Sequence, residues 1–375
     1  MKIVFVGGGT SGHFYPLMAV AEKVNKKSIE NKLVQPSLHY FGESIFNEKM
    51  LRDRGINYSW IPSGKNRLYF SVHNFFDYFK ILAGVIIAFF KLLFLYPDVI
   101  FSKGGYDSLP TCLAAFILRI PIIMHDSDAL PGRASLLISK FAYRIALSYK
   151  EAIPHFNNRG NSKNINNIAV TGQPILEKYL PDNNFKRVYN AGRKNILITG
   201  GSSGSVKIND TILEILPELC SKYNVIHQVG VNNIEDIKIR SSVILESYNK
   251  NAYAPYASID FSKIYSQVDM AISRAGSSMF ELLAWQIPSI IIPISPEVSR
   301  DQAINAEIMQ KNKLFKVIRE ENLSPHLLLN EIIRVLDSRT SYEATLPLNN
   351  TETKSQETAA DIIADEILDI LKTHK

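Results

Sequence analysis

The sequence has only two cysteines in 375 residues, Cys112 and Cys220. Each lies in an apolar stretch that predicts a helix, and the two share no spacing typical of metal ligands. This scarcity indicates reduced structural thiols rather than a disulfide framework, which fits a cytoplasmic protein.

The sequence also lacks a secretory signal and a membrane-spanning run. Strand-like residues begin at Lys2 without an apolar region and cleavage site before them, so we expect no signal peptide. The most apolar stretch has 16 residues between Lys80 and Pro97 and is interrupted by Lys91. A membrane span needs about 18–20 apolar residues, so this stretch is too short. No low-complexity tract or short repeat occurs.

The apolar stretch and the aromatic residues before it predict a long helix with two possible roles. The helix can face the core, or it can place part of its surface at a bilayer, with Lys80 and Lys91 reaching toward the headgroups. In the second case Phe75, Phe76 and Phe79 are the candidates for insertion, although each can equally belong to the core.

Positive charge is concentrated in the first part of the chain. Residues 1–170 hold 20 Lys and Arg against 11 Asp and Glu, whereas the remainder holds 22 against 25. A basic first half indicates an anionic partner, and either nucleic acid or an anionic membrane would serve.

Two similar openings organise the chain. Lys2–Val6 predicts a buried strand that runs into the glycine turn Gly7–His13 and then an amphipathic helix. The pattern returns where Asn195–Thr199 runs into Gly200–Ser205 and a second helix. Strands alternate with helices after both openings, which predicts two α/β domains with doubly wound parallel sheets. The expected boundaries are a first domain at 1–171 with a terminal helix at 358–373, a hinge at 172–193, a second domain at 194–340 and a linker at 341–357.

Residues suited to chemistry gather at the ends of predicted strands. Gly7–His13, Gly104–Tyr106 and His125–Asp128 each follow a strand of the first domain. The carboxyl ends of parallel strands share one edge of a sheet, so these segments should meet in one cleft.

The first glycine turn also satisfies the dinucleotide pattern G-x-G-x-x-G. That pattern expects an acidic residue about 20 positions later, and the only acid near, Glu43, lies at a longer spacing. His13, just inside the predicted helix, suits proton transfer better than the cradling of a pyrophosphate.

The second domain offers a nucleotide site. Ala275–Ser278 precedes a predicted helix, whose N-terminal amides can bind a phosphate. Glu281, about one turn later, can accept both hydroxyls of a ribose, although its spacing alone also fits a solvated helix residue. Ser202 and Ser203 offer further phosphate contacts. Asn305 fits a helix cap or a turn residue as well as a ligand contact.

Taken together, these motifs resemble the MurG family of peripheral membrane glycosyltransferases. The matching blocks follow one another along nearly the whole chain: Gly7–His13, Gly104–Tyr106, His125–Asp128 with Pro131–Gly132, Thr171–Pro174, Gly200–Gly204, His227–Gly230, Arg274–Gly276 with Glu281, and Asp301–Ala306. Each block alone is weak evidence for the resemblance, whereas the blocks together are specific for this family.

The resemblance implies a GT-B fold, with two Rossmann-like domains facing a central cleft, and an inverting hexosyltransferase without bound metal or cofactor. It implies transfer of N-acetylglucosamine from UDP-N-acetylglucosamine to the muramoyl sugar of lipid I, undecaprenyl-pyrophosphoryl-N-acetylmuramoyl-pentapeptide. The product would be lipid II for peptidoglycan synthesis. The protein would lie on the cytoplasmic face of the cell membrane, at its anionic surface, and would not bind nucleic acid.

The resemblance also assigns the site residues. The donor would contact Ser202, Tyr256, Ala257, Ser277, Ser278, Glu281, Asp301, Gln302 and Asn305. The acceptor would contact Gly8, Gly9, Thr10, Ser11, Gly12, Gly104, Gly105 and Tyr106. The base would be His13, with Asp126 or Asp128 assisting.

Several positions depart from the family pattern and bear on the exact sugar and acceptor. They are Ser11, Asp126–Asp128, Leu176 and Asp301. Three alternatives therefore stay open: a UDP-sugar:diacylglycerol glycosyltransferase, a hydrolysing or epimerising UDP-sugar enzyme, and a non-catalytic subunit that binds a sugar nucleotide.

Overall fold

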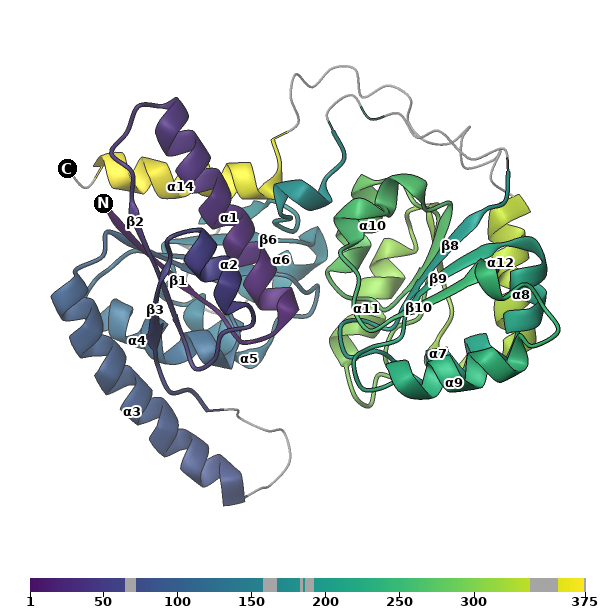
Figure 1. The fold of residues 1–375 in the computed structure, drawn as a ribbon. Helices are drawn as coiled ribbons and strands as arrows, with labels where there is room; N and C mark the ends of the chain where they lie inside the picture. Colours follow the sequence, from purple (N-terminus) through teal and green to yellow (C-terminus); the bar gives the residue numbers. More distant parts are fainter. Residues whose placement is uncertain (65–71, 158–166, 183–184, 186–191, 338–356, 374–375) are drawn as a thin grey trace. The chain divides into compact units, whose positions relative to one another are not determined.

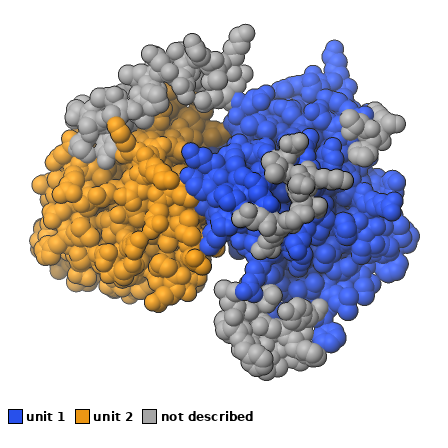
Figure 2. All heavy atoms as spheres, turned by 180° about the vertical axis from the view of Figure 1, so that it is seen from behind, with its two compact units in different colours: residues 1–177, 357–375 blue, residues 178–356 orange. Residues whose placement is uncertain are grey.

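The structure is a computed structural model that describes residues 1–64, 72–157, 167–182, 185, 192–337 and 357–373. The chain divides into two compact units, shown in different colours in Figure 2. The first unit comprises Met1–Glu177 and Glu357–Lys375, and the second comprises Lys178–Gln356. The predicted linker at 341–357 lies almost wholly outside the described residues.

The first unit is built on a sheet of seven parallel strands (Figure 1). The strands are β1 (Lys2–Val6), β2 (Ser37–Gly42), β3 (Asn57–Trp60), β4 (Val99–Ser102), β5 (Ile122–Asp126), β6 (Arg144–Leu147) and β7 (Ile168–Val170). Their order is β3-β2-β1-β4-β5-β6-β7. The helices are α1 (Ser11–Glu30), α2 (Glu48–Asp53), α3 (Val72–Leu95), α4 (Leu109–Ile117), α5 (Arg133–Ile138), α6 (Ile153–Asn157) and α14 (Ala359–Thr373).

The second unit has six parallel strands in the order β10-β9-β8-β11-β12-β13. They are β8 (Asn195–Thr199), β9 (Asn224–Gln228), β10 (Tyr253–Tyr256), β11 (Met270–Ser273), β12 (Ser289–Ile291) and β13 (Phe315–Val317). The helices are α7 (Val206–Glu214), α8 (Leu216–Lys222), α9 (Ile234–Ile244), α10 (Ser278–Ala284), α11 (Arg300–Met309) and α12 (Pro325–Asp337). In both sheets the order runs outward from a central first strand, which confirms the predicted doubly wound, Rossmann-like design.

Apolar strands explain why each sheet is buried on both faces. In β1 the residues Ile3, Val4, Phe5 and Val6 have no exposed surface, so the strand has no solvent side. Strands of this kind need helices on both faces of the sheet, and the helices that follow each strand supply them. The polar side chains that follow the strands are left at one edge of the sheet, where the loops begin.

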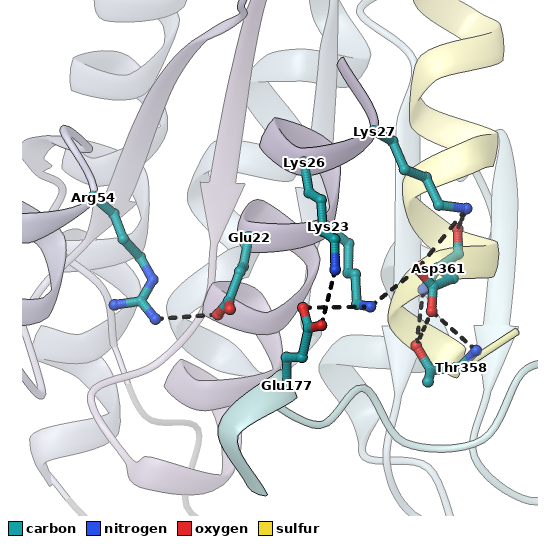
Figure 3. Close-up of polar contacts among 8 residues, drawn as sticks. All are labelled: Glu22, Lys23, Lys26, Lys27, Arg54, Glu177, Thr358 and Asp361. Atoms are coloured by element: carbon teal, nitrogen blue, oxygen red, sulfur yellow. Dashed lines mark hydrogen bonds and ion pairs between the residues drawn. The ribbon is translucent and has the colours of Figure 1, made fainter. Parts of the chain in front are cut away.

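The C-terminal helix α14 packs beside α1, at the other end of the sequence (Figure 1). The Nζ atom of Lys23 in α1 lies 3.3 Å from Oδ1 of Asp361 in α14. It also lies 3.6 Å from Oε2 of Glu177, the last residue before the second unit. Lys26 donates a 2.9 Å hydrogen bond to the same Glu177 (Figure 3). Both points at which the chain leaves the first unit are therefore tied to α1.

Helix α3 buries one side against α4 and exposes the other. Ala88 and Leu92 are fully buried, and Val85 and Phe89 pack against the same apolar cluster. The exposed side chains recur three or four residues apart, which places them on one face: they are Phe79, Leu82, Ile86, Phe90, Leu93 and Phe94. Phe75 and Phe76 belong to α3, but their side chains lie outside the described part of the structure. None of the helices among the described residues is long and apolar enough to cross a membrane.

Candidate active site

The glycine turn after β1 is held against two neighbouring loops. Tyr40 of β2 donates a 2.7 Å hydrogen bond to the Gly7 carbonyl. A Cβ atom on Gly9 would collide with Ser44 Oγ, so the turn packs closely against Ser44. No described residue accepts a hydrogen bond from the N–H groups of Ser11 and Gly12. These amides begin a helix of 20 residues, an arrangement that can bind an anion.

His13 lies between the turn after β1 and the turn after β4. A Cβ atom on Gly105 would lie 3.2 Å from His13 Cε1, so the imidazole packs against bare backbone. Burial lowers the pKa of His13 to about 4, and the positive charge of Lys103 acts in the same direction. Asp128 and Asp107 act in the opposite direction. The imidazole is therefore neutral near pH 7, which is the form that can accept a proton.

Lys103, which was not predicted from the sequence, directly follows β4 and is 2% exposed. Its ammonium group donates a hydrogen bond to the Ser127 hydroxyl. Burial lowers the pKa of Lys103 to about 8, although Asp126 and Asp128 act to raise it. A lysine directly before Gly104, at the end of an otherwise apolar strand, is the signal that could have identified it.

The end of β5 and the residues that follow it include a histidine that supports the fold and two carboxyl groups. His125 is fully buried, and its Nε2 lies 2.9 Å from the Gly172 carbonyl, so it supports the fold. Burial and the nearby charge of Asp128 raise the pKa of Asp126 to about 6. The backbone N–H of Asp128 donates a 3.0 Å hydrogen bond to Asp126 Oδ1. Both carboxyl groups act on Lys103, so these three charges lie close together beside His13.

The turn after β4 brings the predicted acceptor residues next to His13. Gly104 and Gly105 have φ of 72° and 77°, values that favour glycine. The Gly104 N–H donates a 3.1 Å hydrogen bond to Ser102, and Tyr106 begins a short 3₁₀ turn. The structure thus gathers the residues proposed for the acceptor and for the base in one unit.

In the second unit, the turn after β8 is held by Arg274, which directly follows β11. Ser202 is exposed at the tip of this turn. Ser205 closes the turn by accepting hydrogen bonds from Ile208 N at 3.3 Å and from Arg274 Nη2 at 2.6 Å. Arg274 also donates to Glu320, and so it joins the loops after β8, β11 and β13. In the sequence, Arg274 belongs to one of the family motifs, but no role for its side chain was predicted.

The start of α10 offers free amides and a carboxylate. No described residue accepts a hydrogen bond from the N–H groups of Ser277 and Ser278. Glu281 is half-buried, and its Oε2 accepts a 2.6 Å hydrogen bond from Tyr265. Burial raises the pKa of Glu281 to about 7, whereas the Tyr265 bond and the charge of Lys178 act to lower it. An amide pair and a partly exposed carboxylate one turn apart can hold a phosphate and a ribose.

The remaining predicted donor residues lie farther along the same edge of the sheet. Tyr256, which is exposed, and Ala257 end and follow β10. Asp301, Gln302 and the buried Asn305 lie on α11, after β12. Four strand spacings separate β10 from β12, which is about 19 Å. This row of loops suits an elongated ligand rather than a compact one.

Comparison with known proteins gives the class and the family. The glycosyltransferase family 28 N-terminal domain matches residues 3–147, and the family 28 C-terminal domain matches residues 195–365. A crystal structure of Acinetobacter baumannii MurG has a TM-score of 0.70 at 20% identity and covers 98% of this chain and 99% of its own. A UDP-GlcNAc 2-epimerase from Neisseria meningitidis, bound to UDP-GlcNAc, has a TM-score of 0.64 at 15% identity and covers 98% and 100%. The two doubly wound sheets thus define the GT-B fold of glycosyltransferases.

Relatives with higher sequence identity identify the family within the glycosyltransferases. A Bacillus cereus protein named UDP-N-acetylglucosamine–N-acetylmuramyl-(pentapeptide) pyrophosphoryl-undecaprenol N-acetylglucosamine transferase 2 is 34% identical over 358 residues, 93% of this chain and 95% of the relative. A Clostridium kluyveri transferase of the same type is 34% identical over 350 residues, 91% and 93%. The chain belongs to this family of N-acetylglucosamine transferases, and it is a glycosyltransferase.

Proposed function

We propose that the protein transfers N-acetylglucosamine from UDP-N-acetylglucosamine to the muramoyl sugar of undecaprenyl-pyrophosphoryl-N-acetylmuramoyl-pentapeptide. The observation that supports this most strongly is the 34% identity, over more than nine-tenths of both chains, to transferases named for that reaction. The product is the disaccharide-linked lipid, lipid II, from which peptidoglycan is made.

The second unit holds the donor in this proposal. Glu281 accepts the ribose hydroxyls, and the N–H groups of Ser277 and Ser278 receive the diphosphate together with Ser202. Three observations support the assignment: these amides have no acceptor among the described residues, Glu281 Oε1 makes no hydrogen bond to them, and Ser202 is exposed. The uracil lies near Tyr256 and Ala257, and the sugar hydroxyls lie near Asp301, Gln302 and Asn305.

The first unit holds the acceptor and the base. The neutral imidazole of His13 takes the proton of the acceptor hydroxyl, and the oxygen forms a bond to the anomeric carbon of the donor. The bond from that carbon to the UDP oxygen breaks on the opposite face, so the configuration inverts and the electron pair leaves with UDP. Burial keeps the imidazole of His13 unprotonated before reaction, as a base requires, and its low pKa also lowers its basicity. Amides already aimed at the diphosphate stabilise the charge that develops there.

The reaction takes place at a membrane surface, because a polyprenyl acceptor stays in its bilayer. The protein binds reversibly to the cytoplasmic face through the exposed side of α3, defined by Phe79, Leu82, Ile86, Phe90, Leu93 and Phe94. An exposed apolar helix face in a chain segment rich in Lys and Arg is typical of peripheral attachment. The positive charge of residues 1–170 supports an anionic bilayer as the partner.

Turnover tests the proposal. Purified protein is incubated with UDP-N-acetylglucosamine carrying a labelled sugar and a short-chain lipid I analogue, and the labelled products are separated by chromatography. We expect label in the disaccharide lipid and an equal amount of UDP. Parallel reactions with diacylglycerol or without acceptor separate the alternatives. Label in a diacylglycerol product alone would identify a different acceptor, and donor binding without any product would indicate a binding subunit.

A further inference from the structure

The imidazole of His13 has a defined orientation although no described residue makes a hydrogen bond to its ring. Its Cε1 atom faces Gly105, where a Cβ atom would lie 3.2 Å away. Its Nδ1 atom faces Gly8, where a Cβ atom would lie 3.1 Å away. The ring therefore presents Nδ1 to the backbone at Gly8.

A carboxylate outside the predicted site reaches that same place. A Cβ atom on Gly8 would collide with Asp107 Oδ2, so this oxygen and His13 Nδ1 both lie next to the same point over the Gly8 backbone. The other oxygen, Oδ1, accepts a hydrogen bond from Ser63, a residue with 2% of its surface exposed. Ser63 Oγ also lies 2.7 Å from Glu43 Oε2. Oδ1 of Asp107 is thus held by Ser63, and Oδ2 is the oxygen on the side of Gly8 where His13 Nδ1 also lies.

We propose that Asp107 is a positioning residue for His13, acting on Nδ1 so that Nε2 is the atom that accepts the proton. This inference rests on the proposed role of His13 as the base. A negative charge beside Nδ1 favours the tautomer with hydrogen on Nδ1, which leaves the Nε2 lone pair free. The same charge stabilises the imidazolium that forms when Nε2 takes the acceptor proton. The proton then passes to solvent after UDP has left.

The other charges around His13 differ from Asp107 in the contacts they make. Lys103 disfavours the imidazolium, whereas Asp128 favours it, and does so more strongly than Asp107. Asp128, however, is joined through its backbone to Asp126, and its charge also acts on Lys103. Asp107 is the carboxylate that the structure brings to the Gly8 backbone together with Nδ1.

The test is the replacement Asp107→Asn, which keeps the size of the side chain and removes its charge. Protein labelled with ¹⁵N in its histidine rings is studied by NMR at pH 7.5, where the nitrogen chemical shifts report the tautomer. Because the chain has eight histidines, a His13→Gln variant identifies the His13 signals by their loss. We expect Nδ1–H in the wild type and loss of this preference in Asp107→Asn. Asp107→Glu should restore part of it.

Turnover with the lipid I analogue is measured on the same samples. We expect kcat of Asp107→Asn to fall by about 10²–10³-fold, within the range of general-base effects, while both KM values stay within about threefold. An unchanged thermal unfolding midpoint checks that the variant is folded. The proposal is overturned if the wild type lacks Nδ1–H, if Asp107→Asn keeps the wild-type tautomer, or if the tautomer changes and kcat does not. Absence of wild-type turnover would refute the proposed function instead, because the tautomer can still be measured.

Discussion

The pKa of Glu281 leads to a measurable dependence of donor binding on pH. Burial raises this pKa to about 7, and Tyr265 already donates to one carboxylate oxygen. The ionised carboxylate accepts hydrogen bonds from both ribose hydroxyls more strongly than the protonated carboxyl group, because protonation removes the charge and turns one oxygen into a donor. Donor affinity should therefore increase as the pH rises through 7.

The size of the effect follows from the fraction of Glu281 that is ionised. With a pKa of about 7, roughly half of the Glu281 carboxyl groups are ionised at pH 7 and roughly a tenth at pH 6. Below the pKa, each further pH unit costs about 1.4 kcal/mol of binding free energy, because the carboxyl group must first lose its proton. The Kd for the donor should thus be about tenfold weaker at pH 6 than its limiting value above pH 8. Glu281→Ala should weaken binding by about 1.5–3 kcal/mol at pH 8, the usual range for hydrogen bonds to a charged group.

Calorimetry at pH 6, 7 and 8 measures this dependence. The ligand should be UDP-N-acetylglucosamine rather than UDP, because the terminal phosphate of UDP itself titrates at a pKa of about 6. Glu281→Gln should bind weakly and equally at all three pH values. Tyr265→Phe keeps the ring and removes the hydrogen bond that lowers the pKa, so its midpoint should move to higher pH. A wild-type Kd that does not change with pH, or a pH dependence that persists in Glu281→Gln, would refute the reasoning.

Three further predictions concern the first unit. His13→Ala should lower turnover by about 10²–10⁴-fold and leave calorimetric donor affinity unchanged; if turnover stays within a few-fold of wild type, single alanines at Asp126 and Asp128 should show the loss instead. Lys103→Met should move the acidic limb of the kcat profile, measured at saturating donor, to higher pH by about one pH unit, because the Lys103 charge lowers the pKa of His13; an unmoved limb would contradict this. Replacing Leu82, Ile86 and Phe90 with serine should weaken sedimentation with anionic vesicles by about 100-fold, since each side chain is about half exposed and contributes about 1 kcal/mol on burial. The matched control, Ile239→Ser with Val243→Ser on α9, should bind vesicles like the wild type; equal loss in both variants would rule out α3 as a specific membrane face.

The sequence predicts the fold well because its signals are local. An apolar strand followed by glycine and an amphipathic helix occurs at β1 and again at β8, and the structure has the central strand of a sheet at each place. The same rule predicts that functional side chains follow strands, because parallel strands direct their carboxyl ends to one edge. His13 and Glu281 are recognisable for this reason.

Other features depend on contacts between segments that are distant in sequence. Lys103 and Asp107 matter through their approach to the turn at Gly8, about 95 residues earlier, and no local pattern indicates that approach. Helix α3 is apolar nearly all round, so the sequence does not indicate which side is exposed. Packing against α4 buries Ala88 and Leu92 and leaves Ile86 and Phe90 outside, although their chemistry is similar.

Burial shifts the pKa values of His13 and Glu281, the two groups central to the proposed reaction, in opposite directions. In both cases the shift favours the neutral form of the side chain. Burial lowers the pKa of His13 and raises that of Glu281, because a low-dielectric site disfavours charge of either sign. For a base, neutrality is the working form, so His13 needs charge stabilisation only after it accepts the proton. A neutral Glu281 binds the ribose hydroxyls poorly, so binding of the donor must shift Glu281 toward its ionised form. Acidification should therefore impair donor binding several pH units before it protonates His13, which is testable by comparing the pH dependence of the donor KM with that of kcat.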